Sequence, residues 1–437
     1  MTLSLSPSDI KKEGSHFDLP IALLIATKEI TFNRDVFVFG ELGLDGKIKD
    51  TALIYPLILS LYSVERISII IPKDSLQKVE KIPNLEIFPF ETLKECVDFL
   101  EGNIVLEPIL TDGFSTNFIE IDNKRYFYSD KFENDFSDVK GQELAKRVAL
   151  ISAAGFHNIL FEGSPGCGKS MIIKRLREIL PPLDIGEFLE ISKLEALEGK
   201  EPSFIPRRPF RHPHHSSTKA SIFGGGTREA KIGEVALSNN GILFFDELPH
   251  FGRTILESLR EPLEDNRIQI SRVNSKIIYE TSFLFAGAQN PCPCGNLLSN
   301  KNICRCSEYD ITRYKNSLSD PFLDRIDIFL QMGDSDFSNT TTISSKEMFE
   351  KVLVAFKAQK MRGQESLNGK LSEQEINRYC KLDDQNRELL INGANRLGIS
   401  HRGINKILKV ARTIADLENS DEIQKSHLLE AMSFRKR

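Results

Sequence analysis

The eight-residue segment 163–170 constrains the fold of this 437-residue chain more than any other feature. An apolar run at 158–162 precedes it, and a helical pattern at 171–180 follows it. This order matches the strand, G-x-x-x-x-G-K-[ST] loop and helix of a phosphate-binding P-loop, and a chance glycine turn is the weaker alternative. Backbone N–H groups of such a loop surround the phosphates of ATP, Lys169 reaches the β and γ oxygens, and Ser170 ligates Mg²⁺. The predicted loop consists of Gly163, Ser164, Pro165, Gly166, Cys167, Gly168, Lys169 and Ser170.

An acidic motif follows the P-loop along the chain. The apolar run 242–245 ends in two adjacent carboxylates, Asp246 and Glu247, which is a Walker B pattern. Asp246 would hold the Mg²⁺ shell, and Glu247 would polarise the attacking water. A strand that simply ends at the solvent is the alternative, and the P-loop upstream argues against it.

Two further polar residues complete the predicted catalytic set. The apolar run 283–288 leads to Asn290, whose amide could orient the lytic water as a sensor; a turn-forming Asn before Pro291 is the alternative. Arg325 follows a helix-length segment and could project into the site of a neighbouring subunit as an arginine finger. A surface salt bridge is the alternative for Arg325.

The order of strand and helix patterns indicates three regions. Residues 1–128 alternate short strands and helices, which predicts an α/β domain, and the polar stretch 129–138 reads as a linker. Residues 135–335 carry the P-loop and predict a mostly parallel sheet with helices on both faces. Residues 340–437 contain only helical patterns and predict a small helical lid domain.

Composition limits the classes of protein. Hydrophobic residues make up 40% and charged residues 27%, which is globular composition, and no apolar run approaches the roughly 18 residues that span a bilayer. Residues 1–9 lack the pattern of an export signal, so the sequence predicts a soluble, cytoplasmic protein without membrane contact. The net charge of −5 means that any nucleic-acid binding must come from a local basic stripe.

The segment 206–231 provides such a stripe. It contains six basic residues against one acid, together with three histidines and a glycine turn at 224–226. We predict a flexible loop that lines a pore and contacts DNA phosphates, with a solvated basic loop as the alternative. The run 268–278 alternates around Arg272, Asn274 and Lys276 and predicts a second hairpin near the same pore. The basic residues are Arg207, Arg208, Arg211, Lys219, Arg228 and Lys231, and the DNA contacts are assigned to Arg207, Arg208, Arg211 and Lys219.

Four of the seven cysteines lie close together in the sequence. Cys292 and Cys294 form one C-x-C turn, and Cys304 and Cys306 form another. Four thiolates on two turns can surround one tetrahedral Zn²⁺, so a structural zinc site is predicted, with reduced loop cysteines as the alternative.

These motifs together resemble the magnesium-chelatase-like AAA+ ATPases of the ComM (YifB) type. The resemblance implies a hexameric ATPase ring that migrates DNA branches during recombination and natural transformation. It also implies that Arg325 is the arginine finger and that Arg402, at the start of a lid helix, is a sensor-two arginine reaching the γ-phosphate. The segments that carry it are 208–215 (RPFRHPHH), 223–226 (FGGG), 233–241 (GEVALSNNG), 245–249 (FDELP), 290–295 (NPCPCG), 323–327 (LDRID) and 410–417 (VARTIADL).

The first region is similar to the peptidase domain of Lon over the segments 11–18, 40–47 and 69–73. A Lon-type peptidase needs a lysine that activates its serine, and Ile54 stands where that lysine should be. We therefore predict that the chain is not a protease. The resemblance also implies that the chain begins within this domain, through a mis-assigned start or an abbreviated domain.

Two other functions stay open from the sequence. The chain could be a chelatase-type motor that remodels a protein partner during metal insertion, without DNA. It could also be a nucleotide-dependent scaffold, although the complete Walker residues argue against this. DNA-stimulated ATP hydrolysis separates a DNA motor from a chelatase-type motor.

Overall fold

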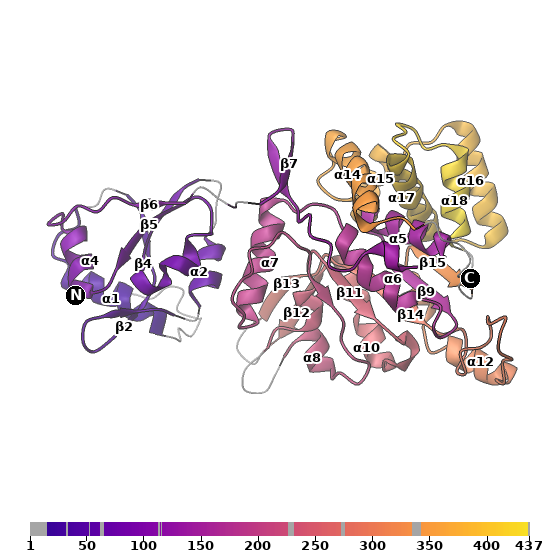
Figure 1. The fold of residues 1–437 in the computed structure, drawn as a ribbon, viewed down its shortest axis with the longest axis horizontal. Helices are drawn as coiled ribbons and strands as arrows, with labels where there is room; N and C mark the ends of the chain where they lie inside the picture. The colour runs from indigo at the N-terminus through magenta and orange to yellow at the C-terminus, as the bar shows by residue number, and fades with distance from the viewer. Residues whose placement is uncertain are drawn as a thin grey trace. The chain divides into compact units, whose positions relative to one another are not determined.

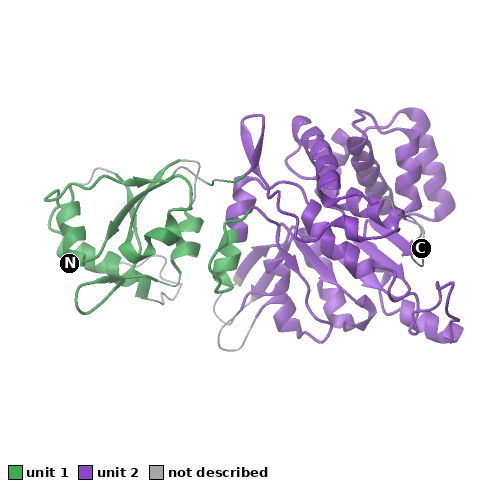
Figure 2. Ribbon diagram, in the orientation of Figure 1, with its two compact units in different colours: residues 1–116, 192–205 green, residues 117–191, 206–437 purple. Residues whose placement is uncertain are grey.

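The computed structural model describes residues 15–31, 34–51, 53–61, 65–111, 114, 116–225, 231–271, 276–333 and 342–435. The chain divides into two compact units (Figure 2). The first unit comprises residues 1–116 and 192–205, and the second comprises residues 117–191 and 206–437. The first unit thus ends before the predicted boundary at residue 128, because the hairpin that follows belongs to the second unit: Phe127 and Leu183 exchange backbone hydrogen bonds of 2.7 and 2.8 Å.

The first unit is built on a small α/β sheet, as predicted. Its strand order is β1-β4-β5-β6, in which β1, β4 and β5 are parallel and β6 is antiparallel to β5 (Figure 1). A core around Leu19, Ile70 and Phe88 lies between the sheet and helices α1 and α4. Ile54, at the position discussed for Lon, is the buried first residue of α2. The elements are η1 (Ser15–Phe17), α1 (Asp18–Ala26), β1 (Val36–Val38), β2 (Glu41–Leu42), β3 (Ile48–Lys49), α2 (Ile54–Ser60), β4 (Ile67–Pro72), η2 (Lys73–Ser75), α3 (Leu76–Val79), β5 (Leu85–Phe90), α4 (Leu93–Leu100) and β6 (Ile109–Leu110).

The second unit contains the predicted parallel sheet. Five strands lie in the order β10-β11-β14-β9-β15, and every neighbouring pair is parallel. Alternate residues enter separate hydrophobic clusters: Phe161 and Phe244 pack in one cluster, whereas Leu160 and Phe245 pack in the other. Because successive side chains of a strand point to opposite faces, helices must cover both faces of this sheet. The strands are β9 (Ile159–Gly163), β10 (Phe210–Arg211), β11 (Ile242–Phe245), β14 (Leu284–Gln289) and β15 (Ile328–Met332).

Helices and two hairpins surround this sheet (Figure 1). The antiparallel pair β12 (Arg267–Ser271) and β13 (Lys276–Glu280) confirms the predicted hairpin, whereas Arg272 and Asn274 lie outside the described residues. The other hairpin pairs β7 (Phe118–Ile121) with β8 (Lys124–Phe127). The helices are η3 (Phe136–Asp138), α5 (Glu143–Gly155), α6 (Lys169–Leu176), η4 (Arg177–Ile179), α8 (Lys219–Phe223), α9 (Glu234–Leu237), η5 (Leu248–His250), α10 (Arg253–Ser258), α11 (Arg260–Asp265), α12 (Glu308–Lys315) and α13 (Asp320–Leu323). Helix α7 (Ile185–Leu197) begins in the second unit, and its residues from 192 onward are assigned to the first.

The C-terminal part is helical, as predicted, and packs on the core that contains the parallel sheet. Side chains of Ser344, Ser372 and Ser400 cap the starts of three helices, and Gly398 ends another in the left-handed conformation. Helix α17 packs against α14 and α18 and also against α5, which joins the C-terminal helices to the rest of the second unit. The helices are α14 (Ser345–Met361), η6 (Asn368–Lys370), α15 (Glu373–Tyr379), α16 (Asp384–Leu397), α17 (His401–Leu417) and α18 (Lys425–Ser433).

Candidate nucleotide-binding site

The parallel sheet brings three predicted motifs to one edge. Strands β9, β11 and β14 are parallel neighbours, so the segments that follow them leave at the same carboxyl edge. These segments are the P-loop after β9, the two acids after β11, and Asn290 after β14. Ligand sites of α/β sheets occupy this edge.

The P-loop requires its glycines. Gly166 and Gly168 have φ values of 81° and 98°, which side chains with a Cβ rarely adopt. A Cβ on Gly163 would lie 2.8 Å from the carbonyl oxygen of Met332. The loop then enters α6 at Lys169, so the backbone N–H groups at this helix start are available to bind phosphate.

Lys169 lies at the centre of the loop. Its ammonium donates to the carbonyl oxygens of Gly163 and Ser164 at 2.5 and 3.0 Å, and to Asn290 Oδ1 at 3.3 Å. Burial lowers the pKa of Lys169 from its usual value. The hydrogen bond to Asn290 places the predicted sensor directly beside the predicted phosphate-binding lysine.

The predicted magnesium ligands are in contact with each other. Ser170 Oγ donates to Asp246 Oδ2 at 2.7 Å, and Asp246 Oδ1 accepts from the backbone N–H of Glu247 at 3.0 Å. A hydroxyl and a carboxylate are hard oxygen donors, which suit Mg²⁺. The residues present at this edge therefore fit the ion.

Glu247 has a strained backbone and an exposed side chain. Its φ of 52° lies in the left-handed region, which is uncommon for residues other than glycine and is found preferentially at functional sites. Its side chain is 54% exposed, so water can reach it.

Histidines beside Glu247 were not assigned to the site from the sequence. His215 Nδ1 lies 3.8 Å from Glu247 Oε2. The centroid of the His215 ring lies 4.1 Å from that of His214 and 6.0 Å from that of His250. His212 stacks on Phe244 of β11. The sequence predicts a flexible pore loop around His212, His214 and His215; in the structure His215 lies next to Glu247, and His212 stacks on the strand that leads to the Walker B carboxylates. The signal that could have identified them is that His215 follows strand β10, which pairs with β11.

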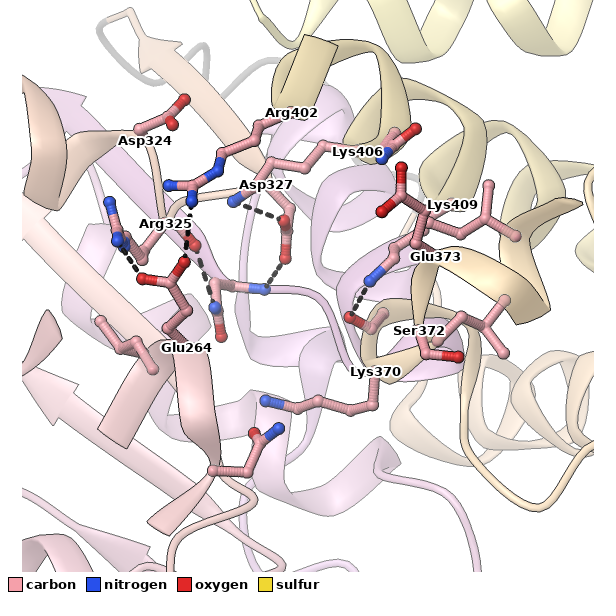
Figure 3. A pocket seen from close by; sticks show the side chains of 17 residues that line it. Glu264, Asp324, Arg325, Asp327, Lys370, Ser372, Glu373, Arg402, Lys406 and Lys409 are labelled. Atoms are coloured by element: carbon pink, nitrogen blue, oxygen red, sulfur yellow. Dashed lines mark hydrogen bonds and ion pairs between the residues drawn. The ribbon is translucent and has the colours of Figure 1, made fainter. Parts of the chain in front are cut away.

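Arg325 and Arg402 lie at the other edge of the sheet. The carbonyl of Arg325 accepts a hydrogen bond of 3.0 Å from Asn158, which precedes β9, whereas the P-loop follows β9. A strand of this length spans roughly 16 Å. Both arginines pair with Glu264 in one cavity of about 470 Å³ (Figure 3). The structure thus brings the two arginines together and places neither of them at the P-loop of its own chain.

The basic stripe is largely neutralised within the second unit. Arg208 is 4% exposed; it pairs with Glu187 at 3.0 Å and donates to the carbonyls of Pro181, Pro182 and Asn240. The prediction that Arg208 contacts DNA phosphates was therefore wrong in this conformation, because its charge is used inside the fold.

The other basic residues of the stripe differ in their surroundings. Arg207 pairs with Glu178 and Glu133 at 2.6 and 2.5 Å, and Arg211 pairs with Glu234 at 2.5 Å. Lys219 is exposed at the start of α8. Gly226 and Arg228 lie outside the described residues.

The four cysteines of the two C-x-C turns form one cluster. The Sγ atom of Cys292 lies 3.4 Å from that of Cys294 and 3.7 Å from that of Cys304, and all four Sγ atoms, including that of Cys306, lie within 4.8 Å of one another. Backbone N–H groups of Arg305 and Asn296 lower the pKa of Cys294 to about 6. The cluster adjoins the P-loop, because a Cβ on Gly295 would lie 2.6 Å from Pro165 Cδ.

Comparison with known proteins places the chain in a family. Residues 135–340 match the family described as magnesium chelatase, subunit ChlI, residues 342–435 match its C-terminal family, and residues 1–75 match subunit ChlI of Mg-chelatase. Competence protein ComM of Haemophilus influenzae is 38% identical over 446 residues, covering 100% of this chain and 85% of that protein. The chain belongs to the ComM/YifB-type magnesium-chelatase-like family. The P-loop unit is thus an AAA+-like domain.

Two other relatives show the range of this family. The protein YifB of Escherichia coli is 38% identical over 447 residues, covering 100% of this chain and 85% of that protein. The magnesium-chelatase 67 kDa subunit of Heliobacterium mobile is 23% identical over 185 residues, covering 35% of this chain and 27% of that subunit. Among the described helices, none is both long and apolar enough to cross a membrane.

Proposed function

We propose that this chain is an ATPase of the AAA+ class that translocates DNA and migrates DNA branches as a ring of identical subunits. The observation that carries the ATPase is the gathering of Lys169, Ser170, Asp246, Glu247 and Asn290 at one sheet edge. The DNA part is supported by the family and by the name of its H. influenzae relative, a competence protein.

Each residue of this edge has a role in the proposed hydrolysis. The P-loop N–H groups and Lys169 bind the phosphates, and Ser170 and Asp246 would hold Mg²⁺, which neutralises charge on the phosphate oxygens. Glu247 polarises the attacking water, and Asn290, beside Lys169, orients that water as the sensor. Hydrolysis then depends on both binding and water activation at the same edge.

The two arginines support assembly into a ring. Arg325 and Arg402 lie at the edge away from the P-loop of their own chain, which supports a role for both at the nucleotide of a second copy. A head-to-tail contact of this kind closes into a ring when the rotation closes. We assign Arg325 as the finger and Arg402 as the second arginine, both acting on the neighbouring subunit; a hexamer is the expected ring.

The test of this function is ATP hydrolysis with and without branched DNA, together with particle size in ATP. We expect DNA to stimulate turnover and ATP to produce a closed oligomer. A rate that ignores DNA, in a protein that hydrolyses ATP and assembles, would favour a chelatase-type motor acting on a protein partner. The similarity to the H. mobile chelatase subunit supports that second candidate.

We also propose that the four cysteines hold a structural Zn²⁺. Tetrahedral zinc with Zn–S bonds of about 2.3 Å places its sulfurs about 3.8 Å apart. The Sγ atoms of Cys292, Cys294 and Cys304 lie 3.4, 3.6 and 3.7 Å from one another, which is close to this value. The ion would fasten the loop after Asn290 against Pro165. Elemental analysis of protein purified without added metal should give about one zinc per chain, and folded, active protein with none would refute the site.

A further inference from the structure

Glu264 is a carboxylate to which neither the motifs nor the proposed hydrolysis gives a role. It is the penultimate residue of α11, and its two oxygens are used separately (Figure 3). Oε2 accepts from Arg325, and Oε1 pairs with Arg402 at 3.1 Å. One side chain therefore holds both arginines that the proposed function assigns to the nucleotide of a neighbouring subunit.

Arg325 is committed to its own chain in this conformation. One terminal nitrogen donates to the carbonyl of Pro321 at 2.7 Å, and the other donates to Glu264. Its side chain is only 11% exposed, whereas that of Arg402 is 63% exposed. A phosphate on another subunit can therefore approach Arg402 first and can bind Arg325 only after Glu264 releases it.

Other cations around the cavity have partners of their own. Lys406 pairs with Asp327 at 3.0 Å, Lys409 donates to the carbonyl of Gly369 at 3.3 Å, and Lys370 donates to that of Phe283 at 2.6 Å. Arg325 and Arg402 differ from these lysines because their shared partner, Glu264, has a side chain that is 44% exposed and can move into solvent.

Release of the arginines requires a competing anion. The hydrogen bond from Arg325 and the charges of Arg325, Arg402 and Arg260 outweigh partial burial and lower the pKa of Glu264, so the carboxylate stays ionised at neutral pH. Guanidinium groups pair with phosphate through two parallel hydrogen bonds, and a terminal phosphate carries more charge than one carboxylate. The terminal phosphate of ATP is therefore a stronger partner for the pair than Glu264.

We propose that Glu264 is a placeholder anion, which occupies Arg325 and Arg402 in the single subunit and is exchanged for the terminal phosphate of ATP bound to a second copy. This inference rests on the proposed function. Glu264 therefore opposes assembly, because each interface that forms must first break the ion pairs of Glu264 with Arg325 and Arg402. The subunit then keeps its arginines folded back until a nucleotide-loaded neighbour arrives.

The test measures particle size against protein concentration in a non-hydrolysable ATP analogue. Glu264→Gln keeps the shape but removes the charge, so assembly should reach its midpoint at a protein concentration about fivefold lower, as expected for the loss of exposed ion pairs. ATP turnover at low protein concentration should rise in parallel. Glu264→Asp keeps the charge and should stay nearer the wild-type midpoint. Glu261→Gln, an exposed carboxylate on the same helix, is the matched control and should leave the midpoint unchanged.

Each outcome decides the proposal. An unchanged or higher midpoint for Glu264→Gln, with thermal unfolding like that of wild type, would overturn the placeholder role. A higher midpoint together with lower turnover would show instead that Glu264 holds the arginines in their productive position. If wild type does not assemble in nucleotide and the Arg325→Ala variant keeps its turnover, the proposed function itself fails. If Arg325→Ala loses turnover while Glu264→Gln has an unaltered assembly midpoint, only the placeholder role of Glu264 is refuted.

Discussion

The two edges of the five-stranded sheet differ in how their polar residues are assembled. At the carboxyl edge, Ser170 and Asp246 contact each other, and Lys169 contacts Asn290. At the amino edge, Glu264, Arg325 and Arg402 come together from α11, from the segment after α13 and from the start of α17. In the proposed function the carboxyl edge binds the nucleotide, whereas the amino edge has arginines without a phosphate-binding loop. The proposal therefore requires that a subunit complete its chemistry with a neighbour.

The largest expected effect tests the carboxyl edge. Lys169→Ala should abolish ATP binding, because the lysine holds the β and γ oxygens. Glu247→Gln should bind ATP normally but lose turnover by at least about a hundredfold, since its carboxylate serves only the chemical step. Equilibrium binding of a fluorescent ATP analogue, measured beside phosphate release, separates the two. Near-normal turnover by Glu247→Gln would remove this residue from catalysis.

The next effect tests whether the amino edge acts on a neighbour. Arg325→Ala should keep ATP binding and lose turnover by about a thousandfold, as for other arginine fingers. Mixing Arg325→Ala with Lys169→Ala should restore part of the activity, because a Lys169→Ala subunit supplies an intact arginine to a neighbour with an intact P-loop. A mixture as inactive as its two components would mean that Arg325 does not act between subunits, and the contrast between the edges would fail.

The carboxyl edge was largely predictable from the sequence, because its chemistry lies in contiguous motifs. The P-loop is eight successive residues, and Asp246 and Glu247 are adjacent, so strand patterns were enough to place them at one edge. The alternation at 268–278 likewise predicted the β12–β13 hairpin. Spacing also brought the four cysteines together.

The amino edge and the surroundings of the Walker B acids depend on tertiary contacts that no local pattern records. Arg402 and Arg325 were predicted as separate residues, but Glu264, which joins them, has no motif. The sequence predicts Arg208 as a DNA contact, because its sequence neighbours do not reveal Glu187 or the carbonyls that surround it. His215 belongs to a loop that looked polar and mobile, yet the pairing of β10 with β11 brings it to Glu247.

A third effect concerns stability at the amino edge, where His157 is buried beside Asp327. Burial lowers the pKa of His157 to about 4, against a charge effect of Asp327 that raises it. The folded pKa lies below the unfolded value of about 6.5, so the unfolded state binds the proton first. Stability should therefore fall as pH drops from about 6.5 to 4, by about 3 kcal/mol in total from this group.

The measurement is urea unfolding of the full chain at several pH values, followed by a signal that reports on the second unit. His157→Gln stays neutral and keeps an amide to hydrogen-bond Thr413, which His157 contacts at 2.7 Å. As pH falls through this window, wild type should lose stability relative to this variant. A difference that does not change between pH 7 and pH 4 would contradict the prediction.

The smallest effect asks whether the exposed end of the basic stripe contacts DNA. Lys219 is the exposed first residue of α8, whereas Arg208 of the same stripe is buried and paired. Lys219→Ala should weaken DNA binding regardless of sequence and should lower the magnitude of the log–log salt slope by about 0.7 to 0.9 for one lost phosphate contact. ATP hydrolysis without DNA should not change, because Lys219 lies outside the nucleotide site.

The matched control is Lys425→Ala, which removes an exposed lysine from the first position of α18. A salt titration of DNA affinity for wild type and both variants decides the question. Equal slopes for the two variants would leave Lys219 a solvated residue, and the DNA part of the proposal would then rest on the family alone.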